Sequence, residues 1–93
     1  MDWIDEQSEN IYKDFVRAVA KNVRQKRIRA SKTVEDIAYD ALQHNSTSFY
    51  NSAENFTHNK HFNLKHLFLI AHYYGCDIRE FFSQGVSSNA PIE

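Results

Sequence analysis

Apolar residues recur every four positions along the first third of the chain, at Ile11, Phe15, Val19 and Val23. An α-helix completes a turn every 3.6 residues, so this spacing places all four side chains on one face. The pattern predicts an amphipathic helix over about residues 9–29. It is the longest helix that the sequence indicates.

A second helix is predicted after a short polar link. Thr33 is followed three residues later by Asp36, the spacing at which a capping box satisfies free N–H groups of a first helical turn. The apolar residues behind this cap also have helical spacing, and they are Val34, Ile37, Ala38, Ala41 and Leu42. Their repeat predicts one buried face.

A third helix is predicted from Asn45 or Ser46 to about Asn55, and its surface is unusual. Its apolar positions are Phe49, Tyr50 and Ala53. Its other positions are small hydrogen-bonding residues, namely Thr47, Ser48, Asn51 and Ser52. A solvated helix ordinarily carries Glu and Lys there, so this face favours contact with a partner. Phe49 is either partly outward or buried beside Tyr50.

Two more helices are predicted towards the C-terminus. Asn63 is placed to cap a fourth helix, and Gly75 is placed to end it in the left-handed conformation. The core stripe predicted for this helix is Leu64, Leu67, Phe68, Ala71 and Tyr74. Asp77 is placed to cap a short fifth helix, and residues 83–93 have no packing pattern and are interpreted as a flexible tail.

Composition supports a single helical domain. The chain has 93 residues, of which 42% are hydrophobic, enough for one small core. Two glycines and one proline are too few for the tight turns of an all-β fold. We therefore expect an all-α domain of five helices over residues 9–82, preceded by an acidic segment over residues 1–8 and followed by the tail.

The single cysteine and the N-terminus indicate the compartment. Cys76 has no partner for an internal disulfide, and we expect a buried structural thiol next to Gly75. The first ten residues are acidic and lack the apolar run of a signal peptide, and no stretch of about 18 apolar residues occurs. A cytoplasmic protein without a membrane partner is expected.

Charge is segregated along the chain although the net charge is only −1. Residues 1–14 hold five acids and one base, whereas residues 15–34 hold seven bases and no acid. Such a block can attract a polyanion, and a solvated helix face is an equally good interpretation. Arg17, Lys21 and Arg24 fall opposite the apolar stripe of the first helix.

The order and spacing of four segments resemble the Xre/Cro/cI-like family of helix-turn-helix regulators. The segments are Val-Arg-Gln-Lys-Arg-Ile at 23–28, Thr-Val-Glu-Asp-Ile-Ala at 33–38, residues 46–55, and residues 63–82 ending in Tyr-Gly-Cys-Asp-Ile-Arg-Glu-Phe-Phe. The resemblance implies a lambda-repressor-like fold with an extended first helix. The chain departs from the family in its longer, glycine-free turn before the third helix, in Phe56 where glycine is usual, and in Val34 where a polar residue is usual.

The resemblance implies sites for DNA on and around the third helix. The implied base-reading residues are Thr47, Ser48 and Ser52, to which Asn51 is added because Asn can pair bidentately with adenine. The implied phosphate contacts are Lys32, Thr33, Asn55 and Lys60, together with backbone N–H groups at the starts of the second and third helices. The Arg17, Lys21 and Arg24 stripe is expected to face away from DNA. Arg27 and Glu54 align with a paired Arg and Glu in phage repressors of the family.

The predicted function is therefore a DNA-binding transcriptional regulator that reads the major groove of double-stranded DNA as a homodimer. Apolar residues near the chain ends support the dimer, namely Trp3, Ile4, Phe81 and Phe82. The alternative is a protein-interaction module on the same fold. We expect no enzyme and no cofactor, because catalytic motifs are missing. We also expect no metal, because His58, His61, His66 and His72 lack ligand spacing.

Overall fold

The computed structural model describes residues 6–83, and this part of the chain is all-helical, as predicted. It contains three α-helices, one π-helix and one 3₁₀-helix. In chain order these are α1 (Glu6–Arg29), η1 (Asp36–Ala41), α2 (Ser48–Glu54), α3 (Leu64–Tyr74) and η2 (Ile78–Phe82). Between Glu6 and Ser83 there is no β-strand.

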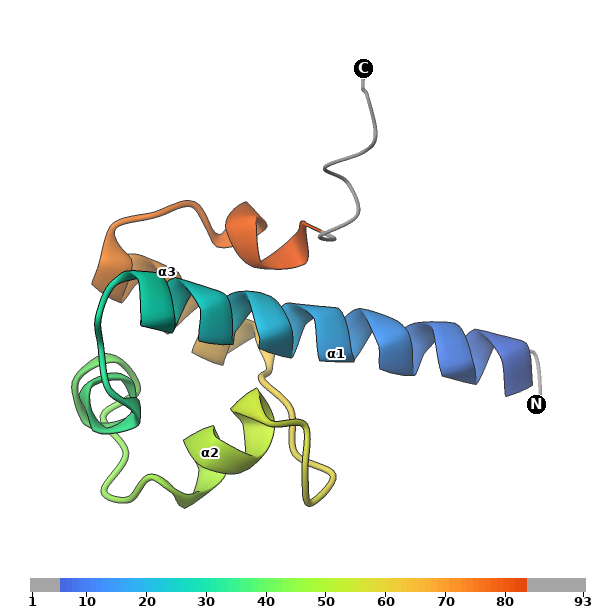
Figure 1. The fold of residues 1–93 in the computed structure, drawn as a ribbon, viewed down its shortest axis with the longest axis horizontal. Helices are drawn as coiled ribbons and strands as arrows, with labels where there is room; N and C mark the ends of the chain where they lie inside the picture. The colour runs from blue at the N-terminus through green and yellow to red at the C-terminus, as the bar shows by residue number, and fades with distance from the viewer. Residues whose placement is uncertain (1–5, 84–93) are drawn as a thin grey trace.

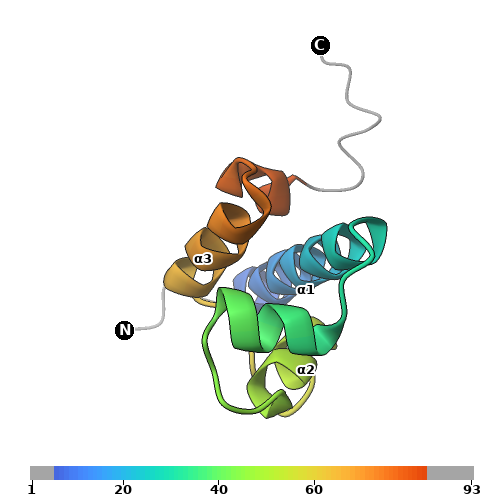
Figure 2. The same ribbon diagram turned by 90° about the vertical axis from the view of Figure 1, so that its left-hand side faces the viewer.

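The long helix α1 is the element around which the others are arranged (Figure 1). It packs against α2 and η2, and α3 packs against η1 and η2. Figure 2 shows η1 and α2 together on one side of α1, with α3 and η2 on another. The N-terminal half of α1 extends beyond all of these elements (Figure 1). The fold therefore has a packed region around the C-terminal half of α1, from which the N-terminal half of the same helix projects.

The core lies where the C-terminal half of α1 meets the other four elements. Its largest fully buried side chains are Tyr50, Phe81, Ile37, Ile70 and Val23, one from each element. Each helix therefore buries at least one anchor against the others. Burying an aliphatic or aromatic side chain of this size contributes about 1.5–3 kcal/mol, so the five anchors supply much of the driving force for folding.

The N-terminal half of α1 differs from the prediction in length and burial. The helix begins at Glu6, so the last residues of the predicted acidic segment are helical, where Glu6 and Glu9 lie favourably at the positive end of the helix dipole. The apolar stripe is covered only in part. Ile11, Tyr12 and Phe15 are 61%, 51% and 39% exposed, because the first turns of the helix extend beyond the other elements (Figure 1).

The core stripe predicted for α3 is wrong at two positions. Leu64 and Phe68 are 69% and 57% exposed, whereas Leu67, Ile70 and Ala71 are buried. The elements η1 and η2 cover the face that is centred on Leu67 and Ile70. Phe68 follows Leu67 directly and so points about 100° away from it around the helix axis. An apolar residue at the edge of the stripe is thus left in solvent.

The predicted helix caps are present. Thr33 N–H donates to Asp36 Oδ2 at 2.9 Å, and Thr33 Oγ1 accepts from Asp36 N–H at 3.0 Å. Asn63 caps α3 in the same way with His66, and Gly75 ends it at φ 70°. Asp77 Oδ1 accepts from Arg79 N–H at 2.8 Å. Each of these bonds joins residues at most three positions apart, which is why sequence spacing predicts them.

Two helices differ in type or bounds from the prediction. After its cap, the second helix widens into π geometry, with Leu42 N–H donating to Ile37 O five residues back. It ends at Ala41, and Gln43 in the turn that follows has φ 59°. The third helix begins at Ser48 and not at Asn45 or Ser46, since the longer turn takes up the intervening residues.

The C-terminal segment covers the apolar groups on which the homodimer prediction rests. Phe81 is buried, and Phe82 stacks on Phe15 with ring centroids 6.1 Å apart. Asn22 Nδ2 donates to Phe81 O at 2.9 Å and holds η2 against α1. The chain thus covers these two rings itself. Trp3, Ile4 and all of the tail except Ser83 lie outside the described residues.

Cys76 is less buried than predicted. The thiol is only half-buried, and this burial raises its pKa.

Among the helices that the structure describes, none has both the length and the apolar character needed to cross a membrane.

Candidate nucleic-acid interface

A buried polar cluster fixes α2 against α1. Glu54 is 5% exposed, and its carboxylate accepts from Arg27 Nε at 2.8 Å and from Arg27 Nη2 at 3.0 Å. Tyr50 Oη also donates to Glu54 at 2.7 Å. Arg27 Nη1 donates to the Lys32 carbonyl at 3.0 Å, which connects the start of the second helix to the same cluster. The structure thus contains the predicted Arg27–Glu54 pair.

The pKa values in this cluster favour one protonation state. Burial, followed by the hydrogen bond to Glu54, raises the pKa of the Tyr50 hydroxyl, so Tyr50 stays a donor. The hydrogen bond to Glu54 raises the pKa of Arg27. Arg27 therefore stays charged and Tyr50 stays protonated at neutral pH. With its inner face held in this way, α2 presents a fixed outer face.

The outer face of α2 is polar and open to solvent. Ser48, Asn51 and Asn55 are exposed, whereas Thr47 and Ser52 are half-buried. A shallow hollow lies along this face, and its lining includes Ser48, Asn51, Ser52 and Lys60. The structure therefore brings together three of the four implied base-reading residues and one implied phosphate contact. Thr47 is the N-cap residue that precedes α2.

Hydrogen bonds already occupy part of this face. Ser52 Oγ lies 3.0 Å from His58 Nδ1, and Asn55 Nδ2 donates to the Asn51 carbonyl at 2.9 Å. Ser48 and Asn51 make no side-chain hydrogen bond within residues 6–83. Of the implied reading residues, these two keep their side-chain donors and acceptors available without breaking an existing contact.

The implied phosphate contacts divide into two groups. Asn55 follows α2, and Lys60 borders the hollow along its outer face. Lys32 Nζ lies 5.6 Å from the centre of the Tyr73 ring on α3. The Thr33 hydroxyl is used in the capping box with Asp36. The contacts of Lys32 and Thr33 are thus made with other elements than α2.

The start of the second helix is poorly suited to a phosphate. The N–H groups of Thr33 and Asp36 already donate to side-chain acceptors in the capping box. The hydrogen bonds from Thr33 lower the pKa of Asp36, so its carboxylate is charged at neutral pH. A phosphate at this helix end would meet that negative charge, and the implied backbone contact is opposed there.

Phe49 is neither fully exposed nor fully buried, so both environments that the sequence left open, partly outward and buried beside Tyr50, apply in part. It is half-buried, with its ring centroid 4.7 Å from that of His66 and 6.0 Å from that of Phe62. It also borders the hollow along α2. Phe56, which replaces the usual glycine after this helix, has φ 57°, a left-handed conformation that is uncommon for an aromatic residue.

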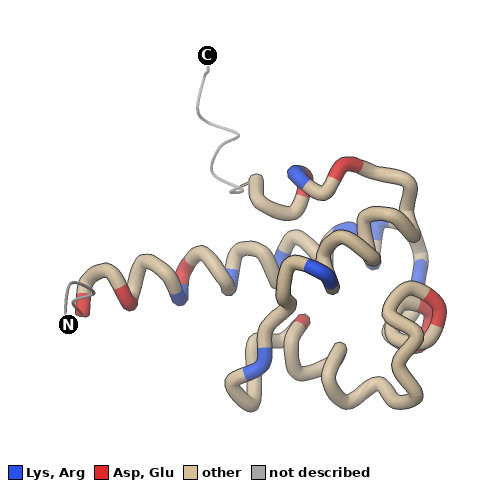
Figure 3. The backbone as a smooth tube through the Cα atoms, turned by 180° about the vertical axis from the view of Figure 1, so that it is seen from behind, with Lys and Arg blue, Asp and Glu red and all other residues tan. Residues whose placement is uncertain are grey.

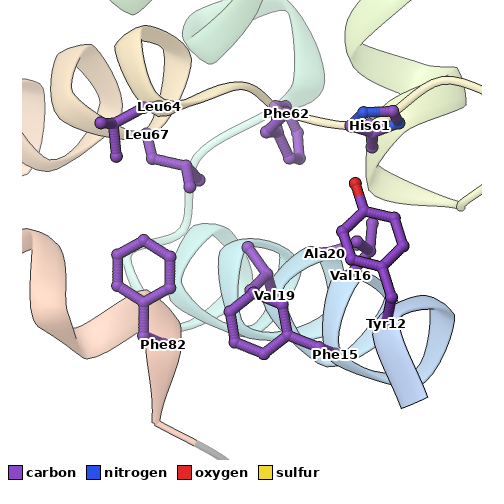
Figure 4. Close-up of a pocket in the computed structure, with 10 residues that line it drawn as sticks. All are labelled: Tyr12, Phe15, Val16, Val19, Ala20, His61, Phe62, Leu64, Leu67 and Phe82. Atoms are coloured by element: carbon purple, nitrogen blue, oxygen red, sulfur yellow. The ribbon is translucent and has the colours of Figure 1, made fainter. Parts of the chain in front are cut away.

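A separate apolar cleft lies between α1 and the start of α3 (Figure 4). From α1, Val19 points towards Leu67 and Tyr12 towards His61, and the Phe15 ring lies on the side of Phe82. Its volume is about 160 Å³. This is about the volume of one large side chain and below the 300–1,000 Å³ typical of small-molecule sites. Within the described residues, no three His, Cys, Asp or Glu side chains form a group that could hold a metal ion.

Sequence reasoning missed the position of the basic residues of α1. Arg17, Lys21 and Arg24 were expected to face away from the interface, but they line a hollow together with Asn55 and Phe56 at the C-terminal end of α2. The excess of bases over residues 15–34 was the available signal. The chain matches no protein-family model, no curated protein and no solved structure, so a function for it has to be argued from these residues.

Proposed function

We propose that this protein is a DNA-binding transcriptional regulator with a lambda-repressor-like helix-turn-helix domain, in which α2 enters the major groove. The observation that carries the proposal is the outer face of α2. It presents Ser48 and Asn51 with free side-chain hydrogen-bonding groups, while Arg27 and Glu54 hold the helix from behind. An α-helix fits the major groove, where each base pair displays a distinct set of donors and acceptors.

The chemistry of this face suits modest sequence discrimination. Asn51 has the amide that pairs bidentately with adenine, and Ser48 has a hydroxyl that both donates and accepts. The helix has no Arg or Gln, so it lacks the usual bidentate partner for guanine. We therefore propose preference for an adenine-containing site. A homodimer would place two such helices on a pseudo-palindromic site, one helical turn of DNA apart.

The arrangement of the second and third helices supports the proposed fold. Figure 2 shows η1 beside α2, and residues 42–47 join the two elements. Gln43 has φ 59° in that turn, so the chain takes the left-handed conformation that a glycine adopts readily. The turn thus holds a left-handed position without a glycine, although it is longer than the turn in the family.

The test is selection of binding sites from random duplex DNA, followed by fluorescence anisotropy with the best site. The variants Ser48→Ala and Asn51→Ala should each weaken specific binding by about 1–3 kcal/mol per lost base contact and leave binding to random DNA unchanged. Asn10→Ala is the matched control, since Asn10 is exposed on the projecting half of α1. Unchanged affinity of both α2 variants for the selected site would refute the proposal.

A protein-interaction module is the second candidate. Exposed apolar side chains of the projecting α1 half and of α3 favour it, and the most exposed are Ile11, Leu64 and Phe68. Surface of this kind marks a protein contact when it is contiguous. A salt titration of binding to random DNA separates the candidates. A DNA-binding protein loses affinity linearly with the logarithm of salt concentration, whereas a protein-interaction module shows no binding to titrate.

A further inference from the structure

Four cations follow one edge of α1 at helical spacing: Lys13, Arg17, Lys21 and Arg24, which we call the α1 basic rim. All four are exposed. Three of them, Arg17, Lys21 and Arg24, share a hollow with Asn55, the residue that follows α2. Figure 3 shows cationic positions along α1 and in the loop beside it. The rim therefore lies beside the proposed DNA-reading helix.

A stacking contact fixes the rim relative to α2. The Arg17 guanidinium carbon lies 4.6 Å from the centre of the Phe56 ring, and Phe56 comes two residues after the end of α2. The left-handed conformation of Phe56, with φ 57°, is unfavourable for a residue with a side chain. The cation–π contact offsets part of that cost. Arg17 is thus held at the C-terminal end of the outer face of α2.

The rim and the outer face of α2 form one continuous surface. Asn55 belongs to both, because it is exposed at the end of α2 and also lines the hollow of the rim. Lys60 makes a second connection. It borders the hollow along α2 and also a hollow that contains Lys13, Arg17 and Phe56. A ligand that lies on α2 would therefore reach rim cations at either side of Phe56.

The surface keeps a net positive charge after its acids are counted. Asp14 lies 3.3 Å from Arg17 in an exposed pair, and Glu9 borders the hollow that contains Lys13. Glu54 lines the rim hollow but is paired with Arg27 inside the fold. Within residues 6–83, neither Lys21 nor Arg24 has an acidic partner. These two cations are therefore available to an external anion.

We propose that the α1 basic rim binds the sugar-phosphate backbone of double-stranded DNA beside the base pairs that α2 reads. This inference rests on the proposed function. From Arg17 to Arg24 the helix advances about 10 Å, at 1.5 Å per residue. Successive phosphates of one DNA strand are about 3.4 Å apart along the duplex axis, so this length covers about three of them. A regular row of single charges matches a polymer of single charges better than one compact anion.

The test measures how binding of the full chain to random-sequence duplex DNA depends on salt, by fluorescence anisotropy. The rim variant is Lys21→Gln with Arg24→Gln, which leaves the Arg17 stack on Phe56 intact. The charge-matched control is Arg29→Gln with Lys65→Gln, two exposed cations outside the rim. Each phosphate contact contributes about 0.9 to the slope of log K against log salt concentration, so the rim variant should lose about two units of slope.

Four outcomes would overturn the inference, and they are distinguishable. If the wild-type chain binds no duplex DNA, the proposed function fails and the rim contact fails with it. If Ser48→Ala removes specificity but the rim variant keeps the wild-type slope, only the rim contact fails. If the rim variant and the control lose equal slope, the effect is general charge. Equal affinity for poly-glutamate and duplex DNA would point to acidic proteins in place of DNA. Thermal unfolding by circular dichroism checks that both double variants fold.

Discussion

The two halves of α1 share one apolar repeat but have opposite environments. Val19 and Val23 in the C-terminal half are 6% and 0% exposed, whereas Ile11 in the N-terminal half is 61% exposed. The three residues lie on the same face of the helix, at intervals of four and eight positions. The repeat therefore identifies an apolar face, but burial depends on whether another element lies against it.

The ion pairs of the two halves show the same contrast. Arg17 and Asp14 pair at 3.3 Å with side chains 60% and 78% exposed, whereas Arg27 and Glu54 pair at 2.8 Å with side chains 15% and 2% exposed. An exposed pair gains little because water screens both charges. A buried pair leaves a charge without solvent when one partner is removed. The same two chemical groups thus contribute differently at the two ends of one helix.

The largest expected effect comes from the buried pair. Glu54→Ala should lower the free energy of unfolding by about 3–5 kcal/mol, because it leaves the largely buried Arg27 charge without a carboxylate and also removes the acceptor for Tyr50. Asp14→Ala is the control from the projecting half and should cost at most about 1 kcal/mol. Urea denaturation measures both values. Similar losses for the two variants would contradict the contrast.

Shortening side chains of the α1 apolar stripe should lower the free energy of unfolding by less than Glu54→Ala does. The loss should again be larger in the packed half than in the projecting half. Val23→Ala removes buried methyl groups and leaves a cavity, so we expect a loss of about 2–3 kcal/mol. Ile11→Ala removes more carbon atoms, but from solvent, and should change stability by no more than about 0.5 kcal/mol. The comparison uses the same urea titration. A large loss for Ile11→Ala would show that something covers the projecting half in solution.

Lowering the pH should reduce the stability of the packed region alone. The loss should be smaller than that caused by Val23→Ala. His66 Nδ1 accepts from Asn63 N–H at 3.1 Å in the cap of α3, and burial lowers the pKa of this histidine below its usual 6.5. The unfolded chain then binds the proton more readily, so stability is complete above about pH 6.5 and falls as the pH drops towards the lowered value. The projecting residues 6–15 contain no histidine.

The variant His66→Gln isolates this effect. Gln can accept in the same capping box but does not titrate, so the loss of stability between neutral and mildly acidic pH should diminish. His72→Gln, on the exposed side of α3, should keep the wild-type profile. Thermal unfolding across that pH range gives the measurement. An unchanged profile in His66→Gln would assign the pH dependence to other groups.

The smallest expected effect is confined to the projecting half. Glu6 and Glu9 lie in the first turn of α1, where each negative charge stabilises the helix end by about 0.3–1 kcal/mol. Glu6→Gln with Glu9→Gln should increase amide hydrogen exchange in the first turns and leave the global unfolding free energy unchanged. A global loss of stability would mean that the projecting turns unfold together with the core.

Local features of the fold follow from the sequence by itself. The caps at Thr33, Asn63 and Asp77 and the helix end at Gly75 form as predicted. Each depends on hydrogen bonds or backbone conformations within a few residues, so the spacing of suitable residue types is sufficient information. The all-helical class follows for the same reason, from repeats of apolar residues over one or two turns.

Tertiary structure alone decided which apolar residues are covered and which charges share a surface. Phe68 fits the stripe predicted for α3 and is exposed, and Arg24 was expected to face away from DNA but shares a hollow with Asn55. Both outcomes depend on contacts between residues far apart in the chain, which require the packing angles and loop paths of several elements at once. A periodic pattern specifies directions around one helix axis, but it contains no information on what lies in those directions.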